Sequence, residues 1–86
     1  MDVERNKITG MRLRKLRTEA NLTQLEVATR LGKTQSFVSK VVNAERELSL
    51  VESFLYAKAL SISYDTLFEE VHDVLVDAGL DTLPER

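Results

Sequence analysis

The sequence of 86 residues contains no cysteine and no tryptophan, and only one histidine, His72, and one proline, Pro84. The lack of cysteine excludes disulfide bonds, zinc ribbons and thiol catalysis, and one histidine cannot build a histidine-rich metal site. No apolar run approaches the ~20 residues of a membrane span, and acidic Asp2 and Glu4 replace the basic start of a signal segment. We therefore expect a soluble cytoplasmic protein with no metal ion, no cofactor and no membrane partner.

Size and composition predict one folded domain over residues 1–86. Domains typically hold about 100–150 residues, so the chain has no room for separate cofactor and substrate domains. Hydrophobic residues make up 43% of the chain and the net charge is only -2, which excludes a disordered chain. The sequence offers no nucleophile–base arrangement and no inducer domain, so we expect neither an enzyme nor a small-molecule receptor.

Charge is distributed unevenly along the chain. Residues 1–46 carry ten basic and five acidic side chains, whereas residues 47–86 carry two basic and nine acidic ones. A basic half beside an acidic half indicates that one end of the molecule meets a polyanion while the other is kept away from it. A chance division of solvated charge explains the pattern equally well, because an isoelectric point near 5.4 is not typical of a strongly basic nucleic-acid binder.

The spacing of apolar residues is helical throughout and predicts an all-α fold with helices over residues 8–20, 23–31, 35–42, 50–60 and 64–78. Residues that can cap a helix precede the last four segments: Thr23, Thr34, Ser49 and Ser63. Glu26 and Glu52, each three residues after a cap, complete two capping boxes. These local signals set four of the five helix starts.

The remaining boundaries have weaker signals. Gly32 and Gly79 are expected to end helices in the left-handed conformation. The first helix has two candidate caps, Asn6 and Thr9, and Gly10 weakens its first turn. Residues 80–86 are expected to be ordered only if a partner holds them. The apolar residues expected on inner faces of the last two helices are Phe54, Ala57, Leu60, Leu67, Phe68, Val71, Val74, Leu75 and Ala78.

Residues 23–42 have the features of a helix-turn-helix. Such a motif needs a small residue at the turn, apolar residues that lock two helices at a steep angle, and a polar outer face on the second helix. Gly32 supplies the turn and Ala28 allows close approach of the helices. The locking residues are Val27, Leu31, Val38 and Val41. The outward polar residues are Gln35, Ser36, Ser39 and Lys40.

Short segments over about residues 8–70 resemble the Cro/C1-type (XRE-family) helix-turn-helix domain of phage repressors and bacterial regulators. The matching segments are 13–17 (LRKLR), 22–24 (LTQ), 27–32 (VATRLG), 34–40 (TQSFVSK), 57–60 (AKAL) and 64–68 (YDTLF). The resemblance implies a compact five-helix bundle of the lambda-repressor-like type, here with an extended fifth helix. It also implies binding to double-stranded DNA, usually as a dimer.

The resemblance implies that the helix over residues 35–42 enters the major groove. A polar helix face fits a groove about 12 Å wide, and residues of its first turn reach base edges. Gln35 can pair bidentately with adenine, Lys40 can reach guanine O6 and N7, and Ser36 is a shorter, less specific contact. Phe37, taken as outward, would contact a thymine methyl group, a sugar or a protein partner.

Other residues are implied as phosphate contacts. Gln24, with the free amides at the start of its helix, resembles the family's phosphate clamp, which uses the positive end of a helix dipole. Asn43 and Arg46 resemble the clamp on the far strand. The further phosphate candidates are Arg12, Arg14, Lys33, Thr34 and Ser39. With roughly four phosphates per subunit, a dimer should give a log–log salt slope of about -7.

Two positions depart from the family pattern. Ala44 follows Asn43 where the family often has glycine, so either Asn43 takes the left-handed turn or the loop follows another path. Val42 stands where the family often has a glutamate that pairs with an arginine at the position of Arg17. Arg17 must then reach Glu45 or Glu47, extend to solvent or bind phosphate, because an unpaired buried arginine is costly.

The fifth helix is longer than the minimal family domain requires. Its apolar face either packs on its own bundle or forms a self-complementary two-fold interface through Val71, Val74, Leu75 and Ala78. We favour the dimer, because two linked heads bind DNA with avidity. The nearby His72 is interpreted as a bystander, since no partner motif accompanies it.

The leading hypothesis is a sequence-specific transcriptional regulator that binds double-stranded DNA as a homodimer. Its operator would be pseudo-palindromic, with half-sites about one helical turn, ~34 Å, apart. The alternative is a protein-interaction module, or an antitoxin-type partner, built on the same fold. Phage repressor, restriction–modification controller and antitoxin all fit the sequence within this class.

Overall fold

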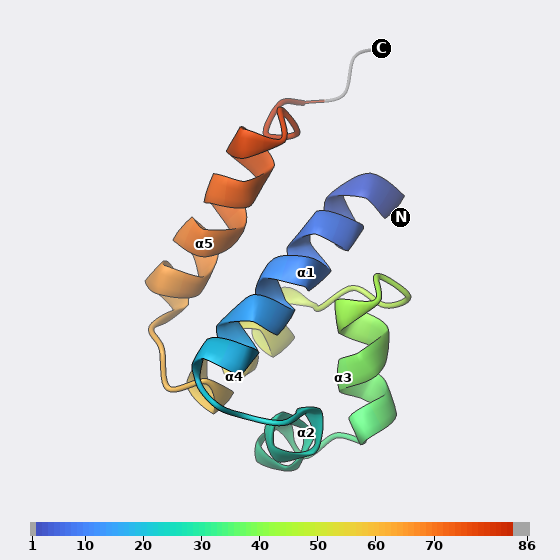
Figure 1. Cartoon of the computed structure of the whole chain (residues 1–86), viewed down its shortest axis with the longest axis vertical. Coiled ribbons are helices and arrows are strands. Elements are labelled where there is room, and N and C mark those ends of the chain that lie inside the picture. Colours follow the sequence, from blue (N-terminus) through green and yellow to red (C-terminus); the bar gives the residue numbers. More distant parts are fainter. Residues whose placement is uncertain (1, 84–86) are drawn as a thin grey trace.

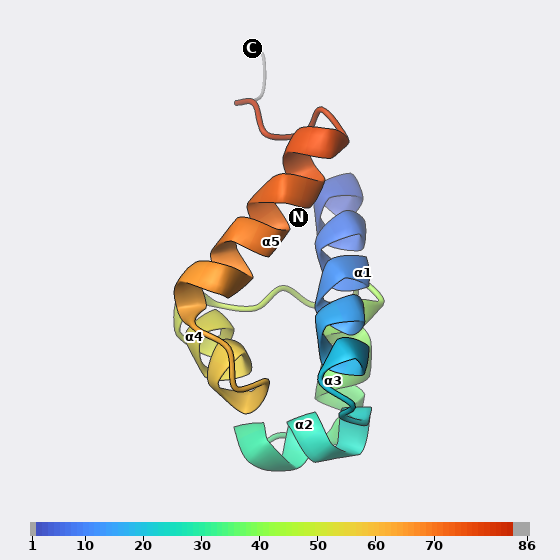
Figure 2. The same cartoon turned by 60° about the vertical axis from the view of Figure 1, so that its left-hand side comes forward.

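The computed structural model describes residues 2–83, which form five α-helices and no strand (Figure 1). The helices are α1 (Val3–Glu19), α2 (Gln24–Leu31), α3 (Gln35–Val42), α4 (Leu50–Ala59) and α5 (Tyr64–Asp77). The long helices α1 and α5 lie side by side, and α2 packs against both α3 and α4 (Figure 2). The prediction of an all-α five-helix bundle is confirmed.

The predicted caps begin α2, α3, α4 and α5. The side chains of Thr23, Thr34, Ser49 and Ser63 each accept a hydrogen bond from the backbone amide three residues later. In the two capping boxes, the glutamate returns a bond to the amide of the cap, at 3.0 Å in α2 and 2.8 Å in α4. Gly32 and Gly79 follow helix ends with φ of 66° and 71°, as predicted.

The predicted start of α1 is wrong. The helix begins at Val3 because Asp2, a good N-cap residue, accepts from the Arg5 amide. Asn6 is not a cap, and its side-chain amide donates to Glu47 at 2.8 Å instead. Gly10 therefore lies in mid-helix and is buried, where an added Cβ would sit 2.5 Å from the Val42 carbonyl oxygen. Glycine thus allows α1 to cross the end of α3 closely.

The core lies between the helices and centres on three fully buried side chains, Val27, Val38 and Tyr56. Tyr56 donates from its hydroxyl to the Leu13 carbonyl, and burial raises the pKa of this phenol to about 12. Phe54 and Phe68, expected to face inward, are instead 47% and 60% exposed. Tyr56 and its small neighbours fill the inner face of α4, so the Phe54 ring stays outside.

The segment after α5 is held within the chain, contrary to the prediction that it needs a partner. The Arg5 side chain donates from Nε to the Leu80 carbonyl at 2.7 Å and from a terminal nitrogen to the Thr82 carbonyl at 2.9 Å. The rest of that prediction, residues 84–86, lies outside the described residues. Between residues 2 and 83, no helix combines the length and apolar character needed to span a membrane.

Candidate nucleic-acid interface

The motif of α2 and α3 is held by a short turn and an apolar contact. Gly32 caps α2 in the left-handed conformation, and the Lys33 amide donates back to the Ala28 carbonyl at 2.9 Å. Val27, Ala28 and Val38 are buried where the two helices meet. This packing fixes one face of α3 against the protein, and the opposite face is left outside.

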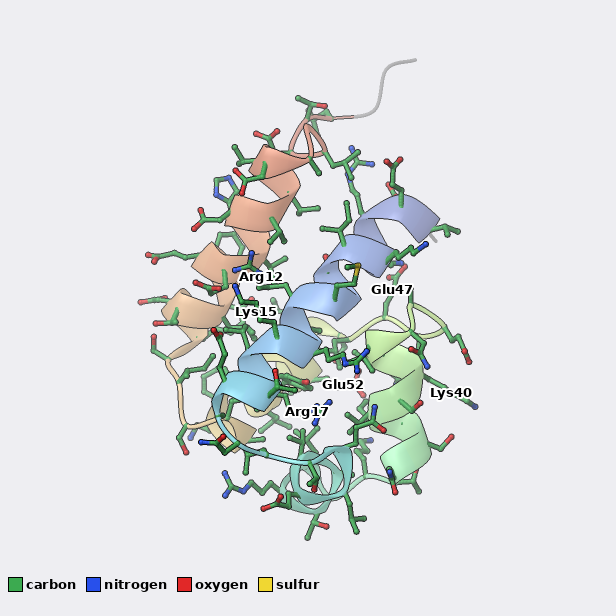
Figure 3. All side chains as sticks on the ribbon, viewed as in Figure 1. Arg12, Lys15, Arg17, Lys40, Glu47 and Glu52 are labelled. Atoms are coloured by element: carbon green, nitrogen blue, oxygen red, sulfur yellow. The ribbon has the colours of Figure 1, made fainter. Side chains whose placement is uncertain are left out.

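The outer face of α3 carries polar side chains with no internal partner. Gln35, Ser36 and Lys40 are all exposed. Lys40 points away from the bundle (Figure 3). Within the described part of the chain, none of the three side chains forms a hydrogen bond or an ion pair. Their donors and acceptors are therefore free for a ligand.

Phe37 does not point outward as predicted. It is half-buried and packs against the hydrophobic core. The Arg46 guanidinium carbon lies 4.5 Å from the centre of its ring, and Lys33 Nζ lies 5.3 Å from it. One helical position separates Phe37 from buried Val38, which turns the ring toward the start of α4 and away from the polar face of α3.

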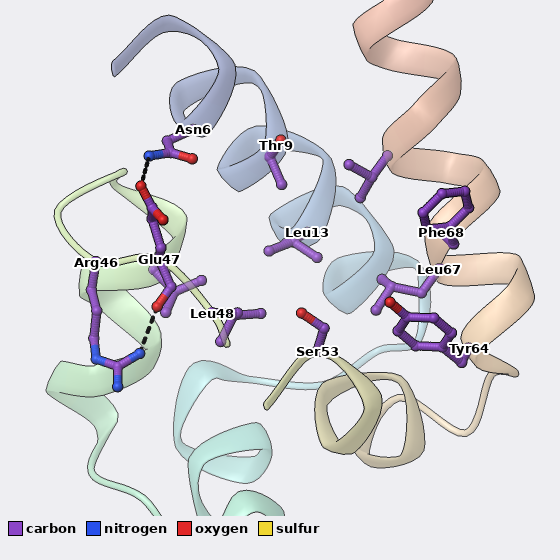
Figure 4. Close-up of a pocket in the computed structure, with 12 residues that line it drawn as sticks. Asn6, Thr9, Leu13, Arg46, Glu47, Leu48, Ser53, Tyr64, Leu67 and Phe68 are labelled. Atoms are coloured by element: carbon purple, nitrogen blue, oxygen red, sulfur yellow. Dashed lines mark hydrogen bonds between the residues drawn. The ribbon is translucent and has the colours of Figure 1, made fainter. Parts of the chain in front are cut away.

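Arg46 is bound to the start of α4. Its guanidinium donates twice to the Glu52 carboxylate, at 3.0 and 3.1 Å, and also to the Glu47 carbonyl at 2.6 Å (Figure 4). These bonds, with the amide of Ser49, lower the pKa of Glu52 to about 2. Arg46 therefore fixes the connection between α3 and α4, and a phosphate contact by its side chain stays a prediction.

The N-terminus of α2 retains free backbone donors. Gln24 is the first residue of the helix and is half-buried. The Thr23 side chain and carbonyl take the amides of Glu26 and Val27. In the described residues the amides of Gln24 and Leu25 have no such partner, as is usual in a first helical turn. The arrangement suits an anion, in keeping with the predicted phosphate clamp.

The two α1 arginines of the predicted phosphate set have different surroundings. Arg12 points toward α5 and pairs with Glu70 at 2.7 Å (Figure 3). Arg14 is exposed. Arg12 thus joins α1 to α5, whereas Arg14 is available to a ligand.

The other predicted phosphate residues lie at the ends of α3. Thr34 is its N-cap and is exposed, and Lys33 is exposed beside it, with Nζ 4.0 Å from Glu52. Asn43 is its C-cap, and the side-chain amide of Asn43 donates to the half-buried Ser39 hydroxyl at 3.4 Å. Of these residues, Lys33 alone has a positive charge with which to bind a phosphate.

The loop after α3 shows how the chain accommodates Ala44 at the position where the family often has glycine. Ala44 takes the left-handed conformation with φ of 62°, and Asn43 remains at φ of -89°. Of the two alternatives for this loop, a left-handed Asn43 is therefore wrong. The amide of Ala44 donates to Val41 and that of Glu45 to Lys40, at 3.2 and 2.8 Å. These two bonds end the helix in the way that a left-handed residue normally allows.

Arg17 follows none of the three expected routes. It is buried, with only 8% of its surface exposed, and lies near the connection between α1 and α2 (Figure 3). One terminal nitrogen donates to the Leu22 carbonyl at 2.7 Å, and Nε has no partner in the described chain. The carbonyl just before α2 thus replaces the missing carboxylate. The described residues also contain no group of three or more His, Cys, Asp and Glu side chains that could hold a metal ion.

Comparison with known families identifies the motif. The sequence profile of the family described as helix-turn-helix matches residues 13–67, which is more than half of the chain. The chain belongs to the Cro/C1-type helix-turn-helix family. No curated protein sequence matches the chain significantly.

Solved structures of the same family are similar to the chain. The restriction-modification controller protein C.AhdI from Aeromonas hydrophila is 39% identical, with a TM-score of 0.67, over 72% of this chain and 94% of the controller. An XRE-family like protein from Pseudomonas syringae pv. tomato str. DC3000 is 34% identical, with a TM-score of 0.72, over 81% of this chain and 85% of that chain.

A more distant structure shares the fold. The clp gene regulator ClgR from C. glutamicum is 21% identical, with a TM-score of 0.72, over 93% of this chain and 96% of that chain. The likeness extends the shared helical architecture beyond the motif to nearly the whole chain.

Proposed function

We propose that the chain is a sequence-specific regulator of transcription that binds double-stranded DNA as a homodimer. In this proposal α3 lies in the major groove of each half-site of a pseudo-palindromic operator. The observation that carries it is the outer face of α3, where Gln35, Ser36 and Lys40 are exposed and have no partner in the described chain. Free polar tips on a short exposed helix suit base edges.

Each contact is assigned by its chemistry. Gln35 would pair with adenine and Lys40 with guanine, and Ser36 would add a less specific contact. Gln24 and the amides at the start of α2 would hold one phosphate. The exposed cations that would meet further phosphates are Arg14 and Lys33. We leave Arg12 and Arg46 outside this surface, because both donate hydrogen bonds to carboxylates, at 2.7 and 3.0 Å, whereas Lys33 lies 4.0 Å from Glu52 and donates none.

The identity of the relatives favours one kind of regulator. The chain is 39% identical to the controller protein C.AhdI over nearly all of that protein. Among the regulator types that fit the sequence, we therefore propose the restriction–modification controller over the phage repressor and the antitoxin. The rival protein-interaction module was motivated by the acidic, apolar C-terminal helix and by an outward Phe37. The Phe37 ring is half-buried, with Lys33 and Arg46 against it, so it gives the rival less support.

The experiment that tests the proposal replaces the two strongest base contacts. Bound sequences are first selected from a random duplex pool, and affinity is then measured by fluorescence anisotropy. The Gln35→Ala, Lys40→Ala double variant should bind the selected site at least about 30-fold more weakly, since each base contact contributes ~1–3 kcal/mol. Lys7→Ala, which removes the same charge from the start of α1, should bind normally. Unchanged affinity of the double variant, or no selection of any sequence, would contradict the proposal.

A further inference from the structure

The outer face of α4 is apolar, although it faces solvent. Its exposed residues Leu50, Val51, Phe54 and Leu55 are 75%, 67%, 47% and 43% exposed. Lys58, which is charged and exposed, follows these residues on the same face of the helix. A helix on the surface of a monomeric domain normally turns polar residues outward, and a helix that is apolar all round is normally buried. We call this stripe, residues 50, 51, 54, 55 and 58, the α4 outer face.

The apolar surface continues onto the start of α5 through a row of aromatic rings. The ring of Phe54 lies 6.3 Å from that of Tyr64, which lies 6.4 Å from that of Phe68. Phe68 is 60% exposed. Tyr64, Phe68 and Leu48 also line a cavity of about 200 Å³ between α1, α4 and α5 (Figure 4). The row therefore joins the α4 outer face to a hollow that has an apolar lining.

The size of this surface fits an interface. The four apolar residues of α4 and Phe68 are 43–75% exposed, and monomeric proteins rarely expose contiguous apolar patches of more than a few hundred Å². A standard interface takes about 800 Å² from each partner. These five residues would form the apolar centre of such a contact.

Of the four apolar residues that the sequence indicated for a dimer contact, Val71 and Val74 are used within the chain, whereas Leu75 is half-buried and Ala78 is exposed. Val71 packs against the core, and Val74 lies beside Ile8 and Met11 of α1. The α1–α5 contact is also tied by the Arg12–Glu70 ion pair. The α5 residues thus leave less free surface for a second copy than the α4 outer face does.

We propose that the α4 outer face, together with Phe68, is the surface on which a second copy of this chain docks. This builds on the homodimer of the proposed function and assigns its contact surface. Charge favours a self-complementary pairing, because Lys58 ends the α4 stripe while Asp65 and Glu69 flank the exposed aromatic rings of α5. None of these three residues forms an ion pair within residues 2–83. α4 and α3 lie on opposite sides of the bundle, so docking leaves α3 free (Figure 2).

Sedimentation equilibrium of the full chain tests this assignment. Val51→Glu and, separately, Leu50→Glu should each weaken dimerisation at least 100-fold, and far-UV circular dichroism should show unchanged helix content because both residues are exposed. Met11→Glu, at a residue 64% exposed on α1, and Val76→Glu, at a residue 44% exposed on α5, are matched controls that should remain dimeric. A dimer that survives both α4 changes, or one that Val76→Glu dissociates, would overturn the assignment.

A charge exchange gives an independent readout. Lys58→Glu should weaken the dimer, and Lys58→Glu with Glu69→Lys should restore part of the loss. A wild-type chain that stays monomeric at micromolar concentration overturns the second copy as the occupant, and a heterologous protein would then be the occupant to seek. That result would not contradict the proposal that α3 binds DNA, because the DNA affinity of the Gln35→Ala, Lys40→Ala variant tests that proposal separately.

Discussion

Two single residues end the helices of the motif in left-handed backbone, and only one of them is glycine. Gly32 follows α2 with φ of 66°, and Ala44 follows α3 with φ of 62°. An L-residue in this conformation brings its Cβ close to a carbonyl oxygen, which costs about 1–2 kcal/mol. Gly32 avoids that cost, whereas Ala44 carries it. The two positions therefore form a natural pair for measuring backbone strain in this fold.

We predict that Ala44→Gly and Gly32→Ala change stability in opposite directions. Ala44→Gly should raise the free energy of unfolding by roughly 0.5–1 kcal/mol, the relief of strain less the added entropy of the unfolded chain. Gly32→Ala should lower it by about 1 kcal/mol through the backbone alone, since nothing lies within 4 Å of the added Cβ. Urea unfolding followed by circular dichroism measures both. Two changes of the same sign would show that φ does not control these positions.

At the scale of helices, the start of α4 holds several parts of the motif together. Glu52 caps α4 through the amide of Ser49 and also accepts two bonds from Arg46. Arg46 in turn covers Phe37 of α3. One carboxylate thus fixes the helix start, the α3–α4 connection and the ring behind the recognition helix. All of these contacts depend on the negative charge of the Glu52 carboxylate.

The lowered pKa of Glu52 predicts a stability that depends on pH. Its pKa is about 2 in the folded protein and near the ordinary 4.5 in the unfolded chain. The contribution is therefore complete above pH 4.5 and is lost as the pH falls toward 2. Thermal unfolding should show a shallower loss of stability over this range in Glu52→Gln than in the wild type. The matched control is Glu26→Gln in the other capping box. Among the described residues no arginine donates a hydrogen bond to Glu26, so this change should reduce the loss of stability at low pH less than Glu52→Gln does. If Glu52→Gln and Glu26→Gln change the pH dependence of stability equally, the dependence arises from the capping boxes and not from the contact with Arg46.

Helix starts were predictable from sequence where the signal is local. Thr23 and Ser49 cap because the residue itself and a glutamate three positions later supply both bonds. The start of α1 was missed because Asp2 was read as a charge and not as a cap. The outer face of α4 also has a signal in the sequence, because apolar residues 50, 51, 54 and 55 lie on a different side of the helix from Ala57 and Leu60. The prediction placed Phe54 with Ala57 and Leu60 on one inner face, which is wrong for Phe54.

The partners of the long side chains were not predictable, because no local sequence pattern selects them. Arg12 meets Glu70 across two helices, and Arg46 selects Glu52 over the nearer carboxylates. Arg17 finds a main-chain carbonyl, which no side-chain pattern encodes. In the candidate site, the exposed residues Gln35 and Lys40 followed from helical spacing, whereas the direction of Phe37 needed the position of α4.

Over the whole molecule, the basic and acidic halves of the sequence partly neutralise each other. Arg12 of the basic half pairs with Glu70 of the acidic half, and Arg46 pairs with Glu52. Among the residues of the predicted site, the exposed cations are Arg14, Lys33 and Lys40, and exposed Arg30 of α2 donates to the Ala59 carbonyl at 2.7 Å. The number of phosphates that the molecule can neutralise is therefore smaller than the count of basic residues implies.

The salt dependence of DNA binding should reflect the two cations assigned to phosphates, Arg14 and Lys33. A dimer that neutralises four phosphates through them should give a log–log slope of about -4, and not the -7 expected from sequence. Titration of the selected duplex between 50 and 300 mM salt measures it. Leu50→Glu, which should leave a monomer on one half-site, should bring the slope to about -2. A wild-type slope near -7 would contradict this assignment and would mean that further cations meet phosphates, such as Arg12 and Arg46 after release from their carboxylates. An equal slope in Leu50→Glu would mean that both heads stay coupled without the α4 outer face.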